Sequence, residues 1–160
     1  MRIWIVLMAM AMLPAVGFAH EKAQPTAAAS SSEAAVQEAA KVVDAFHDAL
    51  KKGDKDGALK HLDDSVQIFE QGWVERSKAE YAGHHLGSDA EFSAATTSRR
   101  TARGGAIVGD LAYVISEGTV TGTFKDKAID SVSLETMVLR GGADGWRIVH
   151  IHWSSRTAKK

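Results

Sequence analysis

The sequence predicts an α+β domain in which helices come first and a curved, mainly antiparallel sheet follows. Apolar residues recur at helical spacing in the first part of the domain, for example at Val36, Ala40, Val43 and Leu50. From about Thr96 the pattern changes to an alternation with a period of two, which is typical of strands. Short connections join these strands, so that neighbouring strands should pair antiparallel.

The helical part contains two capping boxes, in which a serine and a glutamate satisfy free amides at a helix start. Ser30 with Glu33 predicts the start of a long first helix, which should end at Lys51, Lys52 and Gly53. Ser77 with Glu80 predicts a further helix that Gly87 ends, and Ser88 could cap one more turn. Between them, residues 54–64 predict a short helix and residues 66–72 a short strand.

Four longer strands are expected in the second half of the chain. They cover residues 97–109, 111–124, 129–140 and 146–155, and the connections GD, KDKA and GGADG supply the turns.

The first nineteen residues predict a cleavable secretory signal peptide. Arg2 supplies a positive charge, residues 3–13 are apolar, and the small residues Gly17 and Ala19 suit a leader peptidase that cuts after Ala19. The apolar run is shorter than the roughly 20 residues that a membrane span needs, although an uncleaved anchor is the alternative. We therefore expect a periplasmic or secreted protein that has no membrane attachment after cleavage.

The expected domain organisation has four parts. They are a signal peptide (1–19), a flexible linker (20–32), the folded domain (33–156) and a C-terminal tail (157–160).

The composition excludes several classes of function. The 19 Lys and Arg residues against 20 Asp and Glu residues give a formal net charge of −1, without the basic run that nucleic-acid binding needs. There is no cysteine, so that no disulfide framework is available. The sequence contains no phosphate loop, nucleophile elbow or dinucleotide fingerprint, and we expect no cofactor.

Three segments resemble the nuclear-transport-factor-2-like superfamily, which includes the SnoaL-like and ketosteroid-isomerase-like proteins. They are GDLAYV (109–114), ETMVLR (135–140) and DGWRIVHIHWS (144–154), and the last is most similar to the association domain of calcium/calmodulin-dependent kinase and its bacterial stand-alone relatives. The resemblance implies a cone-shaped fold with a long helix and two shorter ones packed on the sheet. It also implies a pocket between the long helix and the concave face of the sheet, and a homodimer or larger assembly through the outer face. It implies no single activity. The association domains carry pocket arginines at positions that match Ile115 and Met137 here, which puts carboxylate binding of their type in doubt.

Alternation in the last strand places His150 and His152 on the side of Trp146, facing the pocket. The other side would carry Val149, Ile151 and Trp153 and meet a partner subunit. The two histidines would lie about 7 Å apart, a spacing that suits two side chains addressing one ligand. The alternative is that each imidazole hydrogen-bonds a buried group and only stabilises the sheet.

Other side chains are expected to line the same pocket. Glu135 could act as a general base with a raised pKa, or it could form an ion pair with Arg100 or with a protonated histidine. Tyr81 and His85, four residues apart on a helix, could donate to a carbonyl oxygen, although a solvated helix end is equally compatible. Tyr113 is a further pocket candidate, whereas His47 is expected to be a satisfied core histidine.

A metal site is not expected, because a pair of histidines two residues apart is a weak signal. The residues that could contribute to one are His85, Asp89, His150 and His152.

Three functions remain open from the sequence. The first is binding of a small, partly apolar organic molecule against His150, His152, Tyr81 and Trp146. The second is general acid–base catalysis of the isomerase, cyclase or dehydratase type, with His150, His152, Glu135 and His85 as catalytic candidates. The third is an assembly domain without a ligand.

Overall fold

The computed structural model describes residues 27–159, and the side chains of residues 33–159. The predicted signal peptide and its cleavage site lie outside this range, as do residues 20–26 of the predicted linker. The elements in chain order are α1 (Ala27–Lys51), α2 (Lys55–Leu59), β1 (Leu62–Glu70), β2 (Trp73–Glu75), α3 (Lys78–Gly83), α4 (Leu86–Ala95), β3 (Thr96–Val108), β4 (Leu111–Phe124), β5 (Lys127–Gly142) and β6 (Gly145–Thr157).

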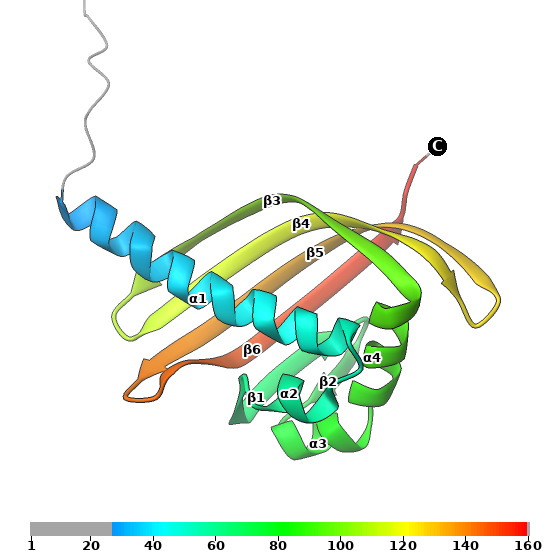
Figure 1. The fold of residues 1–160 in the computed structure, drawn as a ribbon, viewed down its shortest axis with the longest axis horizontal. Helices are drawn as coiled ribbons and strands as arrows, with labels where there is room; N and C mark the ends of the chain where they lie inside the picture. The colour runs from blue at the N-terminus through cyan, green and yellow to red at the C-terminus, as the bar shows by residue number, and fades with distance from the viewer. Residues whose placement is uncertain (1–26, 160) are drawn as a thin grey trace, which may run out of the picture.

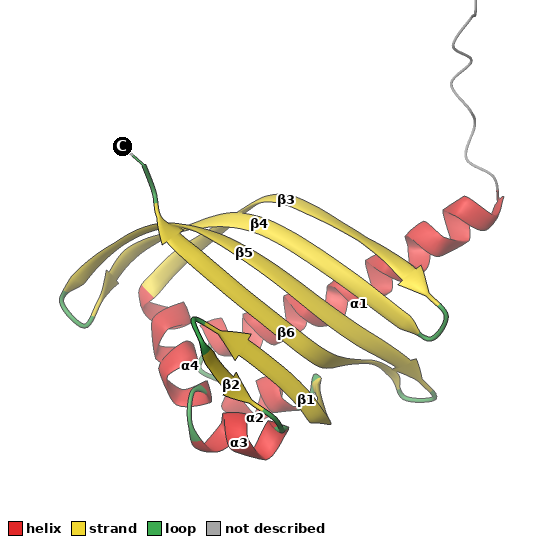
Figure 2. Cartoon of the chain, turned by 180° about the vertical axis from the view of Figure 1, so that it is seen from behind, coloured by secondary structure: helices red, strands yellow, loops and turns green. Residues whose placement is uncertain are grey.

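The strands form one six-stranded mixed sheet in the order β2-β1-β6-β5-β4-β3. Strands β3 to β6 make the expected antiparallel meander, and β1 pairs with β6 in parallel. The sheet curves around α1, which crosses its concave face, and the three shorter helices gather at one end (Figure 1). The view from behind shows no helix over the outer face of β3 to β6 (Figure 2). The predicted α+β class and cone shape are confirmed.

The core lies between α1 and the sheet. Val43 and Phe46 of α1 are fully buried, as are Met137 of β5 and Ile148 and Ile151 of β6. Burying a side chain of this size stabilises the fold by about 1.5–3 kcal/mol. This contact fixes α1 over the sheet and so determines which of its side chains face the cavity described below.

Helix α1 ends where the sequence predicts but begins earlier. Its last residue is Lys51, and Gly53 follows with a φ of 71°, a conformation that glycine adopts without strain. The helix begins at Ala27, ahead of the Ser30 capping box, and therefore includes part of the segment predicted as a linker. The three alanines at 27–29 have the highest helix propensity and explain this extension.

The region between α1 and β3 differs more from the prediction. Ser77 caps α3 as expected and accepts a hydrogen bond from the amide of Glu80 at 3.1 Å. However, α3 ends at Gly83, and Gly87 and Ser88 lie inside the ten-residue helix α4, so that neither has its predicted role. Helix α2 is shorter than predicted because β1 begins at Leu62. The three-residue strand β2 was not predicted.

The four long strands are confirmed, but β6 contains an irregularity that alternation did not predict. Val138 pairs with His150 and Leu139 pairs with Ile148, which leaves Val149 as an extra residue. Such a β-bulge reverses which face each following residue occupies.

The bulge corrects the predicted faces of the last strand. After it, Ile151 is fully buried and Trp153 packs against the core, so that neither can meet a partner subunit. His150 and His152 lie on the outer face beside Phe69, with ring centroids 5.1 Å and 6.4 Å from it. The outer face of β4 and β5 instead exposes Tyr113, Ile115 and Leu134.

None of the helices in the described range is both long and apolar enough to cross a membrane.

Candidate functional site

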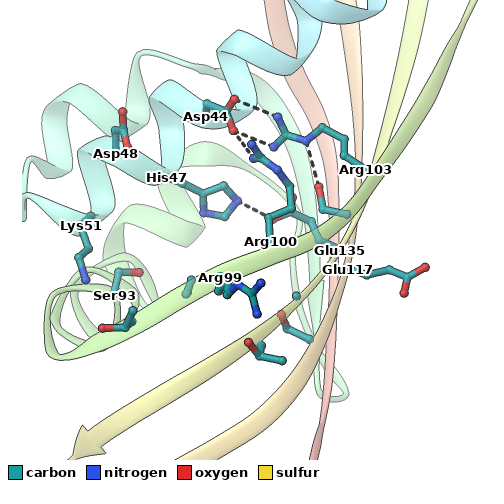
Figure 3. Close-up of a pocket in the computed structure, with 16 residues that line it drawn as sticks. Asp44, His47, Asp48, Lys51, Ser93, Arg99, Arg100, Arg103, Glu117 and Glu135 are labelled. Atoms are coloured by element: carbon teal, nitrogen blue, oxygen red, sulfur yellow. Dashed lines mark hydrogen bonds and ion pairs between the residues drawn. The ribbon is translucent and has the colours of Figure 1, made fainter.

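A cavity of about 700 Å³ lies between α1 and strands β3 to β5. Its wall consists mainly of charged and hydroxyl side chains, and Figure 3 shows how they converge from the helix and the sheet. Helix α1 contributes Asp44, His47, Asp48 and Lys51, strand β3 contributes Arg99, Arg100 and Arg103, and the floor includes Ser116, Ser133 and Glu135.

A cluster of ions joins α1 to β3 at one side of this cavity. Arg103 donates two hydrogen bonds to the two carboxylate oxygens of Asp44, at 2.9 Å and 2.7 Å. Arg100 donates to the same carboxylate at 2.8 Å. Burial alone would raise the pKa of Asp44, but the hydrogen bonds and charges of Arg103 and Arg100 outweigh it and hold the pKa below its ordinary value. One carboxylate thus faces two guanidinium groups.

A second bulge brings the two arginines together. Arg100 pairs with Gly118, Ala102 pairs with Glu117 and Arg103 with Ser116, so that Thr101 is the extra residue. Residues three apart in a regular strand point to opposite faces. The bulge at Thr101 places both guanidinium groups on the inner face.

Next to this cluster, His47 and Glu135 form a dyad. Nε2 of His47 lies 2.6 Å from Oε2 of Glu135, and the indole N–H of Trp153 donates to the same oxygen at 2.8 Å. The Glu135 side chain is 10% exposed whereas that of His47 is 41% exposed. Burial alone would raise the pKa of Glu135, but His47, Trp153 and the charge of Arg103 lower it overall. Glu135 therefore stays ionised and can orient the imidazole.

A smaller cavity of about 190 Å³ adjoins the first and shares His47 and Glu135 with it. Beyond the dyad it reaches Glu70, Asp89, Phe92 and Trp153. Burial and the nearby charge of Asp89 raise the pKa of Glu70 to about 7. The dyad thus lies between an end rich in arginine and an end that carries two acids.

The two acids belong to a buried polar cluster at the α3–α4 end. The hydroxyl of Tyr81 donates to Asp89 at 2.8 Å, and Nδ1 of His85 pairs with Glu75. Burial raises the pKa of both Tyr81 and Asp89. The hydrogen bond from His85 to Glu75 is the main reason that the pKa of His85 is raised.

The predicted site residues divide into two groups. Glu135, expected in the pocket, lines both cavities, and Asp89, considered only as a metal ligand, lines the smaller one. The other predicted residues line neither cavity: Tyr81, His85, Tyr113, Trp146, His150 and His152. Tyr81 is fully buried, and Trp146 packs against the core. Tyr113 is 40% exposed on the outer face, because alternation along β4 turns Val114 inward instead.

The four residues considered as metal ligands do not come together. His85 and Asp89 belong to the buried polar cluster, whereas His150 and His152 lie on the outer face of the sheet. Within residues 27–159, no group of three or more His, Cys, Asp and Glu residues is arranged to hold a metal ion.

The sequence prediction missed the cavity-lining side of α1. Asp44, His47, Asp48 and Lys51 occupy positions i, i+3, i+4 and i+7, which share one helix face. This run of charged residues on one face was the available signal. It was missed because His47 was assigned to the core beside Phe46.

Comparisons with known proteins agree with this architecture. The SnoaL-like domain family matches residues 39–158. A candidate ketosteroid isomerase from Shewanella frigidimarina NCIMB 400 is 42% identical, with a TM-score of 0.70, over 73% of this chain and 94% of that one. No curated protein matches the chain.

Two more distant structures share the fold. The CaMKII hub of S. rosetta is 22% identical, with a TM-score of 0.65, over 75% of this chain and 95% of that one. A candidate dehydratase of the NTF2-like family from Streptomyces avermitilis is 20% identical, with a TM-score of 0.67, over 79% of this chain and 99% of that one. The fold, the family match and the 42% identity agree, and the chain belongs to the SnoaL-like family of NTF2-like proteins.

Proposed function

We propose that this protein binds a small organic carboxylate in the cavity under α1. The observation that carries the proposal is the convergence of Arg100 and Arg103 on one carboxylate, Asp44, at the wall of this cavity. Guanidinium groups recognise the planar carboxylate through two parallel hydrogen bonds, so that the ligand class follows from the side chains present.

The polar wall refines the ligand expected from the sequence. Ser93, Ser98, Ser116 and Ser133 line the larger cavity beside the charged groups. A hydrocarbon skeleton the size of a steroid would displace water from these hydroxyl groups without replacing its hydrogen bonds, which is costly. The polar wall therefore favours a small acid over a large apolar molecule.

A titration with benzoate tests this function. Benzoate should bind, and benzamide, which has the same shape without the charge, should bind at least tenfold more weakly, since charged hydrogen bonds contribute about 1.5–3 kcal/mol. Replacing Arg100→Gln should weaken benzoate binding. Arg140→Gln removes the same charge at a position that lines neither cavity, and it should leave binding unchanged. Equal binding of benzoate and benzamide would refute the proposal.

The dyad favours a second candidate function, proton transfer on the bound acid. A buried carboxylate that orients an exposed imidazole is the arrangement of a general base. The candidate ketosteroid isomerase at 42% identity supports this class of chemistry. His47 would remove a proton from the carbon next to a carbonyl group, and the proton would later return to the product.

Deuterium exchange at the carbon next to the keto group of pyruvate in D2O, followed by NMR, tests this second function. The unmodified protein should accelerate exchange and His47→Gln should not. His150→Gln is the matched control on the outer face and should keep the full rate. Exchange that continues at the same rate in His47→Gln would show that His47 is not the general base.

Self-association through the outer face of the sheet is also proposed. It is supported by the exposed apolar side chains of Tyr113, Ile115 and Leu134 and by the likeness to the hub and association domains of CaMKII.

The pattern of residues 1–19 supports the further proposal that the protein is exported. N-terminal sequencing from the native host should find a chain that begins at His20, and a chain that still begins at Met1 in the membrane fraction would contradict export.

A further inference from the structure

Asp44 occupies the guanidinium groups that a ligand carboxylate would need. Its two oxygens accept from both terminal nitrogens of Arg103 in the two-bond geometry that carboxylates form with arginine. One of these oxygens also accepts from Arg100. The side chain of Asp44 therefore stands in the place, and makes the contacts, of a bound carboxylic acid (Figure 3).

The contact is accessible to a competitor. The side chain of Asp44 is 45% exposed and that of Arg100 is 47% exposed, whereas Arg103 is 19% exposed and lies deeper. Ion pairs that reach solvent are weak, because water and salt compensate both charges when the pair opens. The aspartate side chain can turn toward solvent on a fixed helix, while Arg103 stays held by Ser116, whose hydroxyl accepts from its Nε at 3.4 Å.

We propose that Asp44 is an internal competitor, which fills the arginine site in the absence of ligand and is displaced by the ligand's carboxylate. This inference rests on the proposed carboxylate-binding function. It adds that the affinity for a ligand depends on how much more favourably its carboxylate binds the arginines than the carboxylate of Asp44 does. A bare inorganic anion then competes poorly with Asp44, whereas an organic acid such as benzoate gains further contacts with the cavity wall and can displace it.

Asp48 provides a matched control for the test. It lies one turn further along α1, lines the same cavity and carries the same charge, but within the described range it makes no side-chain hydrogen bond or ion pair. Removing its charge reproduces the general electrostatic effect of Asp44→Asn without emptying the arginine site.

The experiment compares benzoate binding by the unmodified protein, Asp44→Asn and Asp48→Asn in a calorimetric titration. Asp44→Asn should tighten binding about three- to tenfold, since it removes the competitor of two arginines. Asp48→Asn should tighten binding clearly less than Asp44→Asn does, because it removes a negative charge from the cavity but no competitor for the arginines. Equal gains in both variants would reduce the effect to net charge and overturn the inference, as would unchanged or weaker binding by Asp44→Asn.

A second measurement needs no variant. The carboxyl carbon of Asp44, followed by NMR near pH 7 in the unmodified protein, should shift toward the resonance of an exposed, unpaired aspartate when benzoate saturates the site. A resonance that does not move would show that the ligand leaves the ion pair intact and would overturn the displacement. If benzoate binds neither the unmodified protein nor Asp44→Asn, the carboxylate function fails and the inference fails with it. Binding without displacement refutes the inference alone.

Discussion

The two faces of strands β4 and β5 expose opposite kinds of side chain. On the inner face, Ser116, Ser133 and Glu135 line a cavity whose wall is mainly polar and charged. On the outer face, Tyr113, Ile115 and Leu134 are 40%, 45% and 50% exposed. The usual arrangement places the apolar side of a sheet inside and the polar side outside. This partial inversion is the basis of both proposals, a polar ligand inside and self-association through the exterior.

The largest expected effect tests the outer face. Replacing Leu134→Asp places a charge on the most exposed apolar side chain of this patch, and burial of such a side chain in an interface contributes about 1.5–3 kcal/mol. Light scattering should report an assembly for the unmodified protein and a single chain for the variant. Trp73→Asp, which changes an exposed aromatic residue on the short edge strand β2, should keep the assembly. If the unmodified protein is a monomer, the outer face is not an interface between copies and the prediction fails.

A smaller effect is expected inside, at the buried carboxylate. Glu135→Gln removes a charged acceptor shared by His47 and Trp153, and should lower the free energy of unfolding by about 1–3 kcal/mol near pH 7. Because the pKa of Glu135 lies below its ordinary value of 4.5, its contribution is present above that pH and is lost as the pH falls through the folded-state pKa. Urea denaturation in acid should therefore find the two proteins closer in stability. A difference that does not depend on pH would contradict this account.

The smallest expected effect is at Glu70, where a substitution should increase rather than decrease the free energy of unfolding. The folded protein raises the pKa of Glu70 from 4.5 to about 7, so it holds this proton more tightly than the unfolded chain does. The contribution of Glu70 is most favourable below pH 4.5 and falls as the pH rises through this window. Glu70→Gln should therefore stabilise the protein above about pH 7 by roughly 1 kcal/mol, after allowance for solvent screening. The exposed Glu38→Gln is the control, and equal unfolding curves for all three proteins would rule the effect out.

The sequence was sufficient for the fold because most elements carry local signals. The period of two predicted β3 to β6, and Ser77 with Glu80 predicted the start of α3. The extension of α1 to Ala27 and the length of α4 depend on weaker preferences, which one sequence does not resolve. Strand β2 has only three residues, too few to show a period.

The site was harder to predict because two bulges control it. The bulge at Thr101 joins Arg100 and Arg103, and the bulge at Val149 turns His150 outward. In the run Ile148–Val149–His150–Ile151, apolar residues stand at both odd and even positions. The alternation therefore does not show which face of the sheet each residue occupies. The partners of α1 are also distant in sequence, since His47 and Glu135 are 88 residues apart. Only the fold reveals such a pair.

The parallel pairing of β1 with β6 has a consequence for the order in which the chain folds. Strands β3 to β6 can form as successive hairpins, each with a neighbour that is close in the chain. Strand β1 is synthesised before all of them, yet its partner in the meander is the last strand, with Phe69 beside His152 and Glu70 beside Trp153. The β1–β2 hairpin therefore has no place in the sheet until β6 exists. Synthesis must pass β6 before the domain can close, and a chain released before β6 would leave the apolar residues Val66 and Ile68 without the strand beside them.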